Sequence, residues 1–303
     1  MKKIILSCAT IILLVFMGWY FFVKDYNYRI TFKTHQAPGI IYSALLGWNN
    51  GEPLNKKVVS TTSKVPFSEL NQELNVSDSI IDIKWSIERK SDSVTKVTAF
   101  LKDAEHSLFQ KFKIPFTKTD FVKRSLTTVK HIREGLKTHQ TEYKLSSVEE
   151  AIFPEVNCAY ITLSCKLNEK AKLMIAHTID VMNYLRDNNL ELKGDPFLEV
   201  TEWNLNEDLI TFDFCFPIAK QYSYPESKLI KIKTIKEKKA LRTIFNGNYR
   251  ISDRGWFTLL DYADRNNIEI DNNPIEVFLN DPHSGGVELE WEAEIYLPVR
   301  TKL

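Results

Sequence analysis

The sequence predicts an α+β protein in which an N-terminal apolar segment precedes two globular units. An internal repeat carries most of this prediction. Residues 182–192 (MNYLRDNNLEL) recur 78 positions later as residues 260–270 (LDYADRNNIEI), and the strand predicted at 211–218 corresponds to residues 292–299. Each half of the repeat is expected to fold as strand, helix, strand and strand, because its apolar residues recur first with helical spacing and then with period two. A duplicated βαββ domain is therefore predicted over residues 146–303.

Composition limits the classes of protein to consider. With 303 residues and 44% hydrophobic content, the chain is long and apolar enough for two cores. Its 40 basic and 39 acidic residues give a net charge of +1, which predicts no nucleic-acid partner. Cys8 lies in the apolar segment, and Cys158, Cys165 and Cys215 have no histidine or acidic neighbour at metal-ligand spacing. These three are expected to be small buried side chains, and neither a metal nor another cofactor is predicted.

The first 26 residues are predicted to attach the chain to a membrane. Residues 4–23 are almost entirely apolar, and a helix of twenty residues spans roughly 30 Å, the thickness of a bilayer core. Lys2 and Lys3 favour a cytoplasmic N-terminus, while Trp19 and Tyr20 suit the interfacial region. The exit of the segment is bulky and lacks a small-residue cleavage site, so an uncleaved anchor is preferred to a cleaved signal and secretion. In either case the rest of the chain is expected to be exported.

Residues 27–145 form the first predicted unit. Strands are expected at 28–32, 80–88, 94–101 and 107–114, with a short helix after Ala37-Pro38 and no clear strand rhythm between residues 47 and 74. A capping box from Thr117 to Asp120 is predicted to start a long helix that reaches about residue 136. This order of elements, with the phrase IKWSIE at residues 83–88, resembles the START/SRPBCC helix-grip fold. The resemblance implies a hydrophobic cavity between helix and sheet, and a packed scaffold is the alternative.

The second unit is predicted to end in a hairpin over residues 274–299. Its turn covers residues 280–286, and from Val287 onward the second strand alternates apolar and polar residues. One face then carries four glutamates and a tyrosine: Glu288, Glu290, Glu292, Glu294 and Tyr296. Two helices are expected to pack on the opposite face, one at residues 169–187 and one that starts near Ser252.

This stretch resembles the closing hairpin of the gyrase-inhibitor-like small-molecule-binding domains, also called AraC-type effector-binding domains. The resemblance rests on Leu-Asn-Asp-Pro at residues 279–282 and Glu-Ile-Tyr-Leu-Pro-Val at residues 294–299. It implies a domain of two SHS2-like βαββ repeats over residues 146–303 that binds a small molecule, with ligand contacts carried over to Glu294. Some members of that family are hydrolases. No helix-turn-helix can be placed in this sequence, so direct regulation of DNA is not expected.

The candidate ligand site follows from the repeat. Asp213 and Glu294 occupy matching positions, each a few residues before a strand-ending proline, and both are predicted to face away from the helices into a groove. A cationic ligand can supply the partner that such an acid needs, and aromatic walls strengthen the contact. The predicted aromatic walls of this groove are Tyr296, Trp256, Tyr160, Tyr249 and Trp203. For Asp213, pairing with a lysine or a backbone amide is the alternative. For Glu288, Glu290 and Glu292, a solvated strand face is preferred.

The sequence thus predicts a membrane-anchored protein of the cell envelope that binds a small molecule, such as a lipophilic cation, without catalysis. A hydrolase that acts in the same groove is one alternative. A structural or partner-binding envelope protein with a closed groove is the other. The openness of the groove and the pairing of Glu294 distinguish these alternatives.

Overall fold

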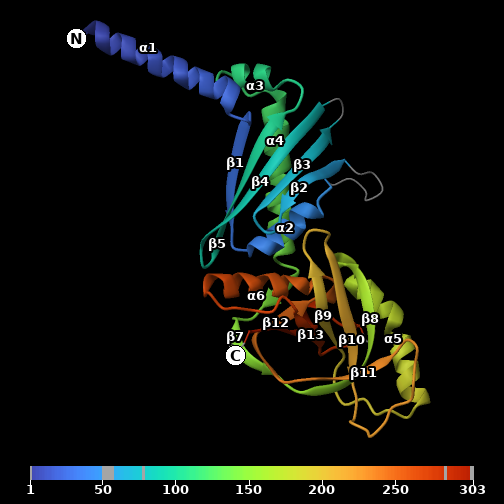
Figure 1. Ribbon diagram of the computed structural model, residues 1–303. Helices are drawn as coiled ribbons and strands as arrows, with labels where there is room; N and C mark the ends of the chain where they lie inside the picture. Colours follow the sequence, from blue (N-terminus) through green and yellow to red (C-terminus); the bar gives the residue numbers. More distant parts are fainter. Residues whose placement is uncertain (1, 50–57, 77–78, 283–284, 301–303) are drawn as a thin grey trace. The chain divides into compact units, whose positions relative to one another are not determined.

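The computed structural model describes residues 2–49, 58–76, 79–282 and 285–300 (Figure 1). His283 and Ser284 of the predicted turn, and residues 50–57 of the segment without strand rhythm, lie outside the described residues. The chain forms two compact units, Met1–Lys137 and Thr138–Leu303.

The chain begins with α1 (Lys2–Gly18), which continues into a π-helical turn, η1 (Trp19–Val23). Within them, Lys3–Val23 has a mean hydropathy of 2.3 and no part of it is buried. Its 21 residues are long and apolar enough to cross a membrane, although signal sequences near an N-terminus have the same character.

The first unit is built on a five-stranded antiparallel sheet in the order β1-β5-β4-β3-β2. The strands are β1 (Tyr28–Thr34), β2 (Val59–Val65), β3 (Glu69–Val76), β4 (Ser79–Ser91) and β5 (Val94–Asp103). Two helices, α2 (Pro38–Leu46) and α4 (Asp120–His139), contribute to one hydrophobic core with this sheet. Trp85 is fully buried in that core, where its indole N–H donates to Gln72. The helix-grip resemblance of this unit stays a prediction.

Two sequence predictions in the first unit are wrong. Residues 107–114 form a helix, α3 (Ser107–Lys113), and not a strand. The cause lies just before it, where the Asp103 carboxylate accepts the backbone N–H groups of Glu105 and His106 and so begins a helical turn. The segment before residue 74 does contain strands, β2 and β3. Their rhythm is hidden in the sequence because a buried Gln72 occupies a core position between Leu70 and Leu74.

The long helix of the first unit starts close to the predicted place. The side chain that caps it is Thr119, whose hydroxyl accepts the N–H of Val122 at 3.3 Å. The capping box predicted from Thr117 is therefore misplaced by two residues. Helix α4 then runs to His139 and buries an apolar stripe that includes Val122, Val129 and Leu136.

The second unit contains a nine-stranded sheet with the path β11-β8-β10-β9-β13-β14-β12-β6, and β7 pairs with β12. Its strands are β6 (Tyr143–Leu145), β7 (Glu149–Phe153), β8 (Val156–Lys166), β9 (Phe197–Asn204), β10 (Leu209–Pro217), β11 (Lys231–Ile235), β12 (Lys238–Gly247), β13 (Ile275–Phe278) and β14 (Glu292–Pro298). Its helices are α5 (Lys170–Asp187) and α6 (Asp253–Arg265), and short 3-10 turns occur at η2 (Leu167–Glu169), η3 (Tyr249–Ile251) and η5 (Glu288–Glu290). Both long helices begin within one residue of their predicted starts.

The two halves of this unit have the same order of elements and meet at the middle of the sheet. The order is β8-α5-β9-β10 in the first half and β12-α6-β13-β14 in the second, and β9 pairs with β13. In that pair Leu198 lies opposite Glu276, the two positions that the 78-residue offset relates. The first and second halves therefore meet across this pair of strands.

The sheet curls strongly. Strands β11 and β12 lie towards opposite ends of its path, yet only Lys236 and Glu237 separate them in the chain. The span from Ile235 to Lys238 is at most about 11 Å, so the two ends must approach each other. Helix α6 packs on the outside, where a Cβ on Gly255 would lie 2.2 Å from Ile295 Cδ1. We call the opposite side of the sheet the inner face.

The predicted closing hairpin is confirmed in its pairing and wrong in one detail. Strands β13 and β14 are antiparallel neighbours, with Val277 opposite Glu294. The second strand does not begin at residue 287, however, because η5 replaces its first part and leaves Glu288 and Glu290 exposed. Side chains of the long connection fix this shape, since the Asn280 amide oxygen accepts the N–H of Glu292 at 2.7 Å.

Candidate ligand-binding face

A row of side chains crosses the inner face from one half of the second unit to the other. Directly opposed residues of antiparallel strands point to the same side of a sheet. The registers align six residues in this way: Thr162, Asp213, Glu199, Ile275, Tyr296 and Arg242. Acidic, basic and phenolic groups are thus brought onto one face from both halves, with Ile275 between them.

The ammonium group of Lys233 is enclosed at one end of this row. Its Nζ donates to Glu199 Oε2 at 2.6 Å and to Asp213 Oδ2 at 2.5 Å. The same Nζ lies 4.6 Å from the centroid of the Tyr160 ring. We call Asp213, Glu199 and Tyr160 the ammonium cage. Both of its acids are buried, and Lys238 on β12 also donates to Glu199, at 2.7 Å.

The cage stabilises charged forms on both sides of the contact. Burial alone would lower the pKa of Lys233, but the neighbouring Cys215 and the hydrogen bonds to Asp213 and Glu199 together raise it above its ordinary value. Burial alone would likewise raise the pKa of Glu199, but the ammonium groups of Lys233 and Lys238 hold it below its ordinary value. Both groups are therefore ionised over the neutral pH range.

Glu294 lies in a second charged set on the same face. Its Oε1 accepts Arg242 Nη1 at 2.9 Å and its Oε2 accepts the Tyr296 hydroxyl at 2.6 Å. Burial, and then the hydrogen bond to the Glu294 carboxylate, raise the pKa of Tyr296 to about 12. Arg242 also pairs with the exposed Glu149 on β7. Glu294 is thus paired within the chain.

The structure does not bring Asp213 and Glu294 together. They lie on β10 and β14, which are three strand steps apart in the sheet. At about 4.8 Å per step, this separation is roughly 14 Å along the sheet. Each acid has its own cationic partner within the chain, Lys233 for Asp213 and Arg242 for Glu294.

Apolar side chains occupy the inner face beside the two charged sets. The rings of Phe153 and Tyr296 lie 5.4 Å apart, and those of Phe153 and Phe197 lie 5.7 Å apart. The buried members of this cluster are Phe153, Cys158, Phe197, Cys215, Ile235, Ala240, Ile275 and Tyr296. Strand β7 therefore contributes the ring of Phe153 to the inner face, which was predicted from the sequence to be a groove.

The remaining aromatic candidates lie elsewhere. Trp256 is fully buried, and its ring contacts that of Trp203 at 5.3 Å. Trp203 shares a face with Val200 because a β-bulge between Thr211 and Phe212 shifts the register. Tyr249 is buried and donates its hydroxyl to the backbone oxygen of Glu292 at 2.7 Å. Of the predicted aromatic walls, the inner face holds Tyr160 and Tyr296.

Sequence reasoning missed three residues of this face: Glu199, Lys233 and Lys238. Glu199 had a signal, because it is a single acid within the apolar stretch of residues 197–200 (FLEV). The two lysines had none. They lie on strands two or three steps away from those of the acids, and the order of the strands cannot be derived from the sequence around each lysine.

A second polar set is buried between the halves, on the helix side. Lys170 Nζ lies 2.6 Å from Ser252 Oγ and 3.3 Å from Glu276 Oε2, and all three residues are 0% exposed. Burial raises the pKa of Glu276, against the lowering by Lys170 and Ser252. A lysine beside a serine is one way to activate a nucleophile. Here, however, the hydroxyl is inaccessible to a substrate.

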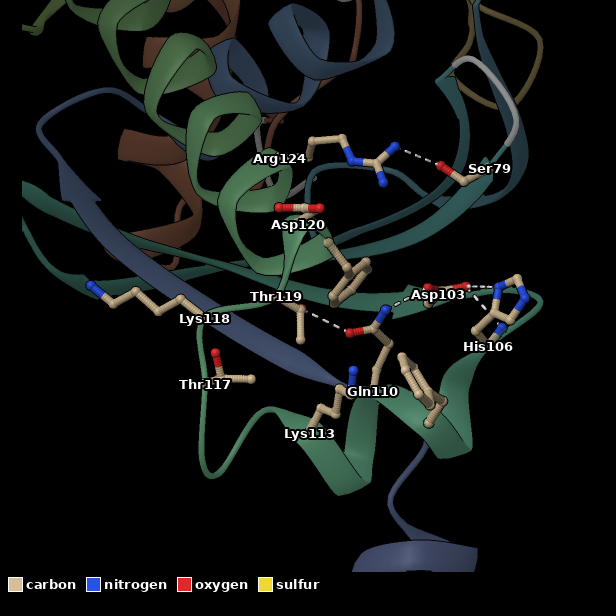
Figure 2. Close-up of a pocket in the computed structure, with 12 residues that line it drawn as sticks. Ser79, Asp103, His106, Gln110, Lys113, Thr117, Lys118, Thr119, Asp120 and Arg124 are labelled. Carbon is tan, nitrogen blue, oxygen red and sulfur yellow. Dashed lines mark hydrogen bonds and ion pairs between the residues drawn. The ribbon is translucent and has the colours of Figure 1, made fainter.

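The first unit contains a pocket of about 690 Å³ beside the start of α4 (Figure 2). Figure 2 shows Gln110 between two partners, since its amide donates to Asp103 and accepts from Thr119. The basic residues of its lining are His106, Lys113, Lys118 and Arg124. Within the described residues, no three or more His, Cys, Asp or Glu side chains are grouped to hold a metal.

The second unit is thus a curled sheet with helices outside and a polar, aromatic inner face. Residues 147–300 match the family model described as the GyrI-like small molecule binding domain. The chain belongs to this GyrI-like family. A search of curated proteins gives no match.

Several solved structures are similar to the same part of the chain. The C-terminal domain of EcmrR is 19% identical, covers 53% of this chain and 99% of its own, and has a TM-score of 0.43. SAV2435 bound to tetraphenylphosphonium is 10% identical, covers 51% and 94%, and has a TM-score of 0.34. A hydrolase from Listeria innocua is 9% identical, covers 54% and 97%, and has a TM-score of 0.35.

Proposed function

We propose that this chain is a membrane-attached protein that binds small organic cations on the inner face of its second unit. One observation carries the proposal: the ammonium cage already holds a cation. Two buried carboxylates and the face of Tyr160 surround the Lys233 ammonium, which is the arrangement that recognises a ligand ammonium. The structure therefore represents a state in which a side chain of the protein occupies the cation position.

A ligand reaches this position by displacing Lys233. Strand β11 is an edge strand of the sheet, paired only with β8 among the described strands, so the lysine can leave without breaking the centre of the domain. Phe153 and Tyr296 then provide apolar area for aromatic groups of the ligand. Glu294 remains the proposed second counter-charge, for a ligand long enough to reach from the cage to Arg242.

Calorimetric titration with aromatic ammonium and phosphonium ions, tetraphenylphosphonium among them, tests this proposal. Lys233→Met removes the competing ammonium and should tighten cation binding by about 10- to 100-fold, the scale of a charged hydrogen-bonded contact. Lys172→Met is the matched control, because this exposed lysine lies on helix α5 and not on the inner face. It should leave the affinity unchanged.

Two further variants test which carboxylate binds which kind of cation. Asp213→Asn should weaken a compact ammonium by about 10-fold or more, whereas Glu294→Gln should weaken only longer cations, by about 1–3 kcal/mol. Equal affinities in the parent and in all three variants, or tighter binding of neutral analogues, would refute the cation proposal.

Catalysis is not part of the proposal, because Ser252, the serine in contact with Lys170, is fully buried. Membrane attachment rests on the apolar segment Lys3–Val23. Fractionation of cells that make the full chain tests it. Recovery in the membrane fraction with the segment Lys3–Val23 still present is expected. A soluble form that begins near residue 24 would show that the segment is a cleaved signal.

A further inference from the structure

Helix α3 is amphipathic in the opposite sense to a helix of a water-soluble protein. Its polar Gln110 and Lys111 face inward and are 8% and 5% exposed. Its large apolar residues face outward, with Leu108 60% exposed, Phe109 54% and Phe112 64%, and Phe116 in the following turn is 83% exposed. A patch of this kind on a soluble surface usually marks a contact with a membrane or a partner.

Buried hydrogen bonds fix this orientation. The Gln110 amide joins Asp103 to Thr119, as Figure 2 shows, and these bonds tie α3 to the end of β5 and to the start of α4. Rotation of the helix that buried the phenylalanines would break both bonds and leave the Asp103 carboxylate short of a donor. The outward position of the apolar side chains is therefore built into the fold.

The inward face of α3 also holds the end of the N-terminal apolar segment. Lys111 Nζ donates to the backbone oxygen of Phe21 at 3.0 Å and to that of Lys24. In return, the Tyr20 hydroxyl donates to the backbone oxygen of Lys111 at 3.0 Å. Helix α3 thus lies directly against the last turn of the segment Lys3–Val23.

We propose that α3 and the turn through Phe116 lie in the interfacial region of the bilayer that the N-terminal segment enters. This inference rests on the membrane attachment proposed above. The occupant is the lipid surface because the apolar patch is attached to the exit of the apolar segment. Lys113 and Lys118 flank Phe116 in the chain, where they can contact lipid phosphates. The first unit is then held by two contacts, one that crosses the bilayer and one that lies on it.

Site-directed spin labelling of the full chain in phosphatidylcholine–phosphatidylglycerol vesicles tests this inference. The labelled variants are Phe112→Cys and Phe116→Cys in a Cys8→Ser, Cys165→Ser background, which leaves only buried native thiols. Collisions with oxygen report lipid exposure, and collisions with a water-soluble nickel chelate report water exposure. At positions 112 and 116 we expect the ratio of oxygen to nickel collisions to exceed that of a water-exposed site by about threefold or more.

Two control positions make the result decisive. Ser93→Cys labels an exposed turn beyond the far end of β1, about 20 Å from Tyr28, and should collide mainly with nickel. Ile12→Cys labels the middle of the apolar segment and reports attachment itself. A lipid-exposed position 12 with water-exposed positions 112 and 116 would overturn the inference and leave attachment standing. Low collision rates with both reagents at 112 and 116 would show a protein partner or a second copy on the patch, and would also overturn it. Water exposure at position 12 would overturn both the interfacial position of α3 and the membrane attachment of the chain.

Discussion

Removal of the Lys170 charge should destabilise the second unit more than removal of the whole buried pair. Lys170→Met keeps most of the side-chain volume but leaves Glu276 ionised or forces it to take up a proton. Both residues are 0% exposed and their charged atoms lie 3.3 Å apart. Loss of one partner of a fully buried ion pair costs about 3–5 kcal/mol, since the other charge stays uncompensated.

The structure places this variant within that range. Glu276 Oε2 still accepts the Ser252 hydroxyl at 2.9 Å, so one hydrogen bond to the carboxylate survives. The single hydroxyl hydrogen of Ser252 is then used, so the backbone oxygen of Tyr249, a second acceptor of the Lys170 ammonium, loses its donor. We therefore expect a loss of about 3–5 kcal/mol for Lys170→Met. The double variant Lys170→Met, Glu276→Leu should lie within about 1 kcal/mol of the parent.

The stability of Lys170→Met should fall as pH rises. Burial raises the pKa of Glu276 above its ordinary value, and loss of Lys170 removes an influence that lowers it. A carboxyl group whose folded-state pKa is raised favours folding below its unfolded pKa and loses that contribution as pH rises. Lys170→Met should therefore approach the stability of the double variant near pH 4 and fall below it as pH rises towards 7.

Thiol labelling during urea titration of the full chain measures the stability of this unit alone. Cys158 and Cys215 are fully buried in its sheet, and Cys8 and Cys165 are replaced by serine. Labelling of the two buried thiols then reports unfolding of the second unit. Lys172→Met, an exposed change two residues along the same helix, should shift stability by less than about 0.5 kcal/mol. Equal stability of Lys170→Met and the double variant at pH 7 would contradict the reasoning.

Three further outcomes are expected. The two lysine partners of Glu199 hold its pKa below its ordinary value, so Glu199 contributes stability above about pH 4.5 that is lost as pH falls through its folded pKa. Glu199→Gln should therefore flatten the acid limb of a stability–pH curve. An unchanged acid limb would contradict this expectation. Lys233→Ala should be less stable than the parent in thermal unfolding, and added methylammonium should restore the lost stability whereas methanol should not. Equal responses to the two solutes would argue against an ammonium cage. Residues 138–303 should fold alone, because they contain a complete sheet and its helices. Circular dichroism should then show one cooperative thermal transition for this fragment. A fragment without such a transition would show that the second unit depends on the first.

Much of the second unit could be predicted from the sequence because its signals are local and occur twice. The repeat located both helices to within one residue, and the alternation of the closing strand placed Glu294 and Tyr296 on the face opposite the helix. The same alternation failed over residues 288–290. There, side-chain hydrogen bonds of the long connection determine the backbone, and period-two spacing carries no information about them.

The candidate site could be predicted only in part, because half of its charges come from distant strands. Asp213 was recognised, and its pairing with a lysine was one of the two alternatives. Which lysine could not be predicted, since Lys233 lies on β11, two strand steps from Asp213, and the local sequence does not give the order of the strands. In α3 the error was of another kind, because the start of this helix depends on the hydrogen bonds of the Asp103 carboxylate and not on the spacing of its apolar residues.

The opposition of Leu198 and Glu276 at the centre of the sheet has a consequence for how two such halves can be joined. A residue at the meeting point of two identical halves faces its own copy. Two glutamates there would place like charges on directly opposed, buried positions, whereas two leucines would leave the Lys170 ammonium without a counter-ion. A buried ion pair at this position therefore requires halves that differ, which a single covalent chain permits and a symmetric assembly of separate copies does not. In this chain the two positions differ, so a single carboxylate faces the Lys170 ammonium from the meeting point of the two halves.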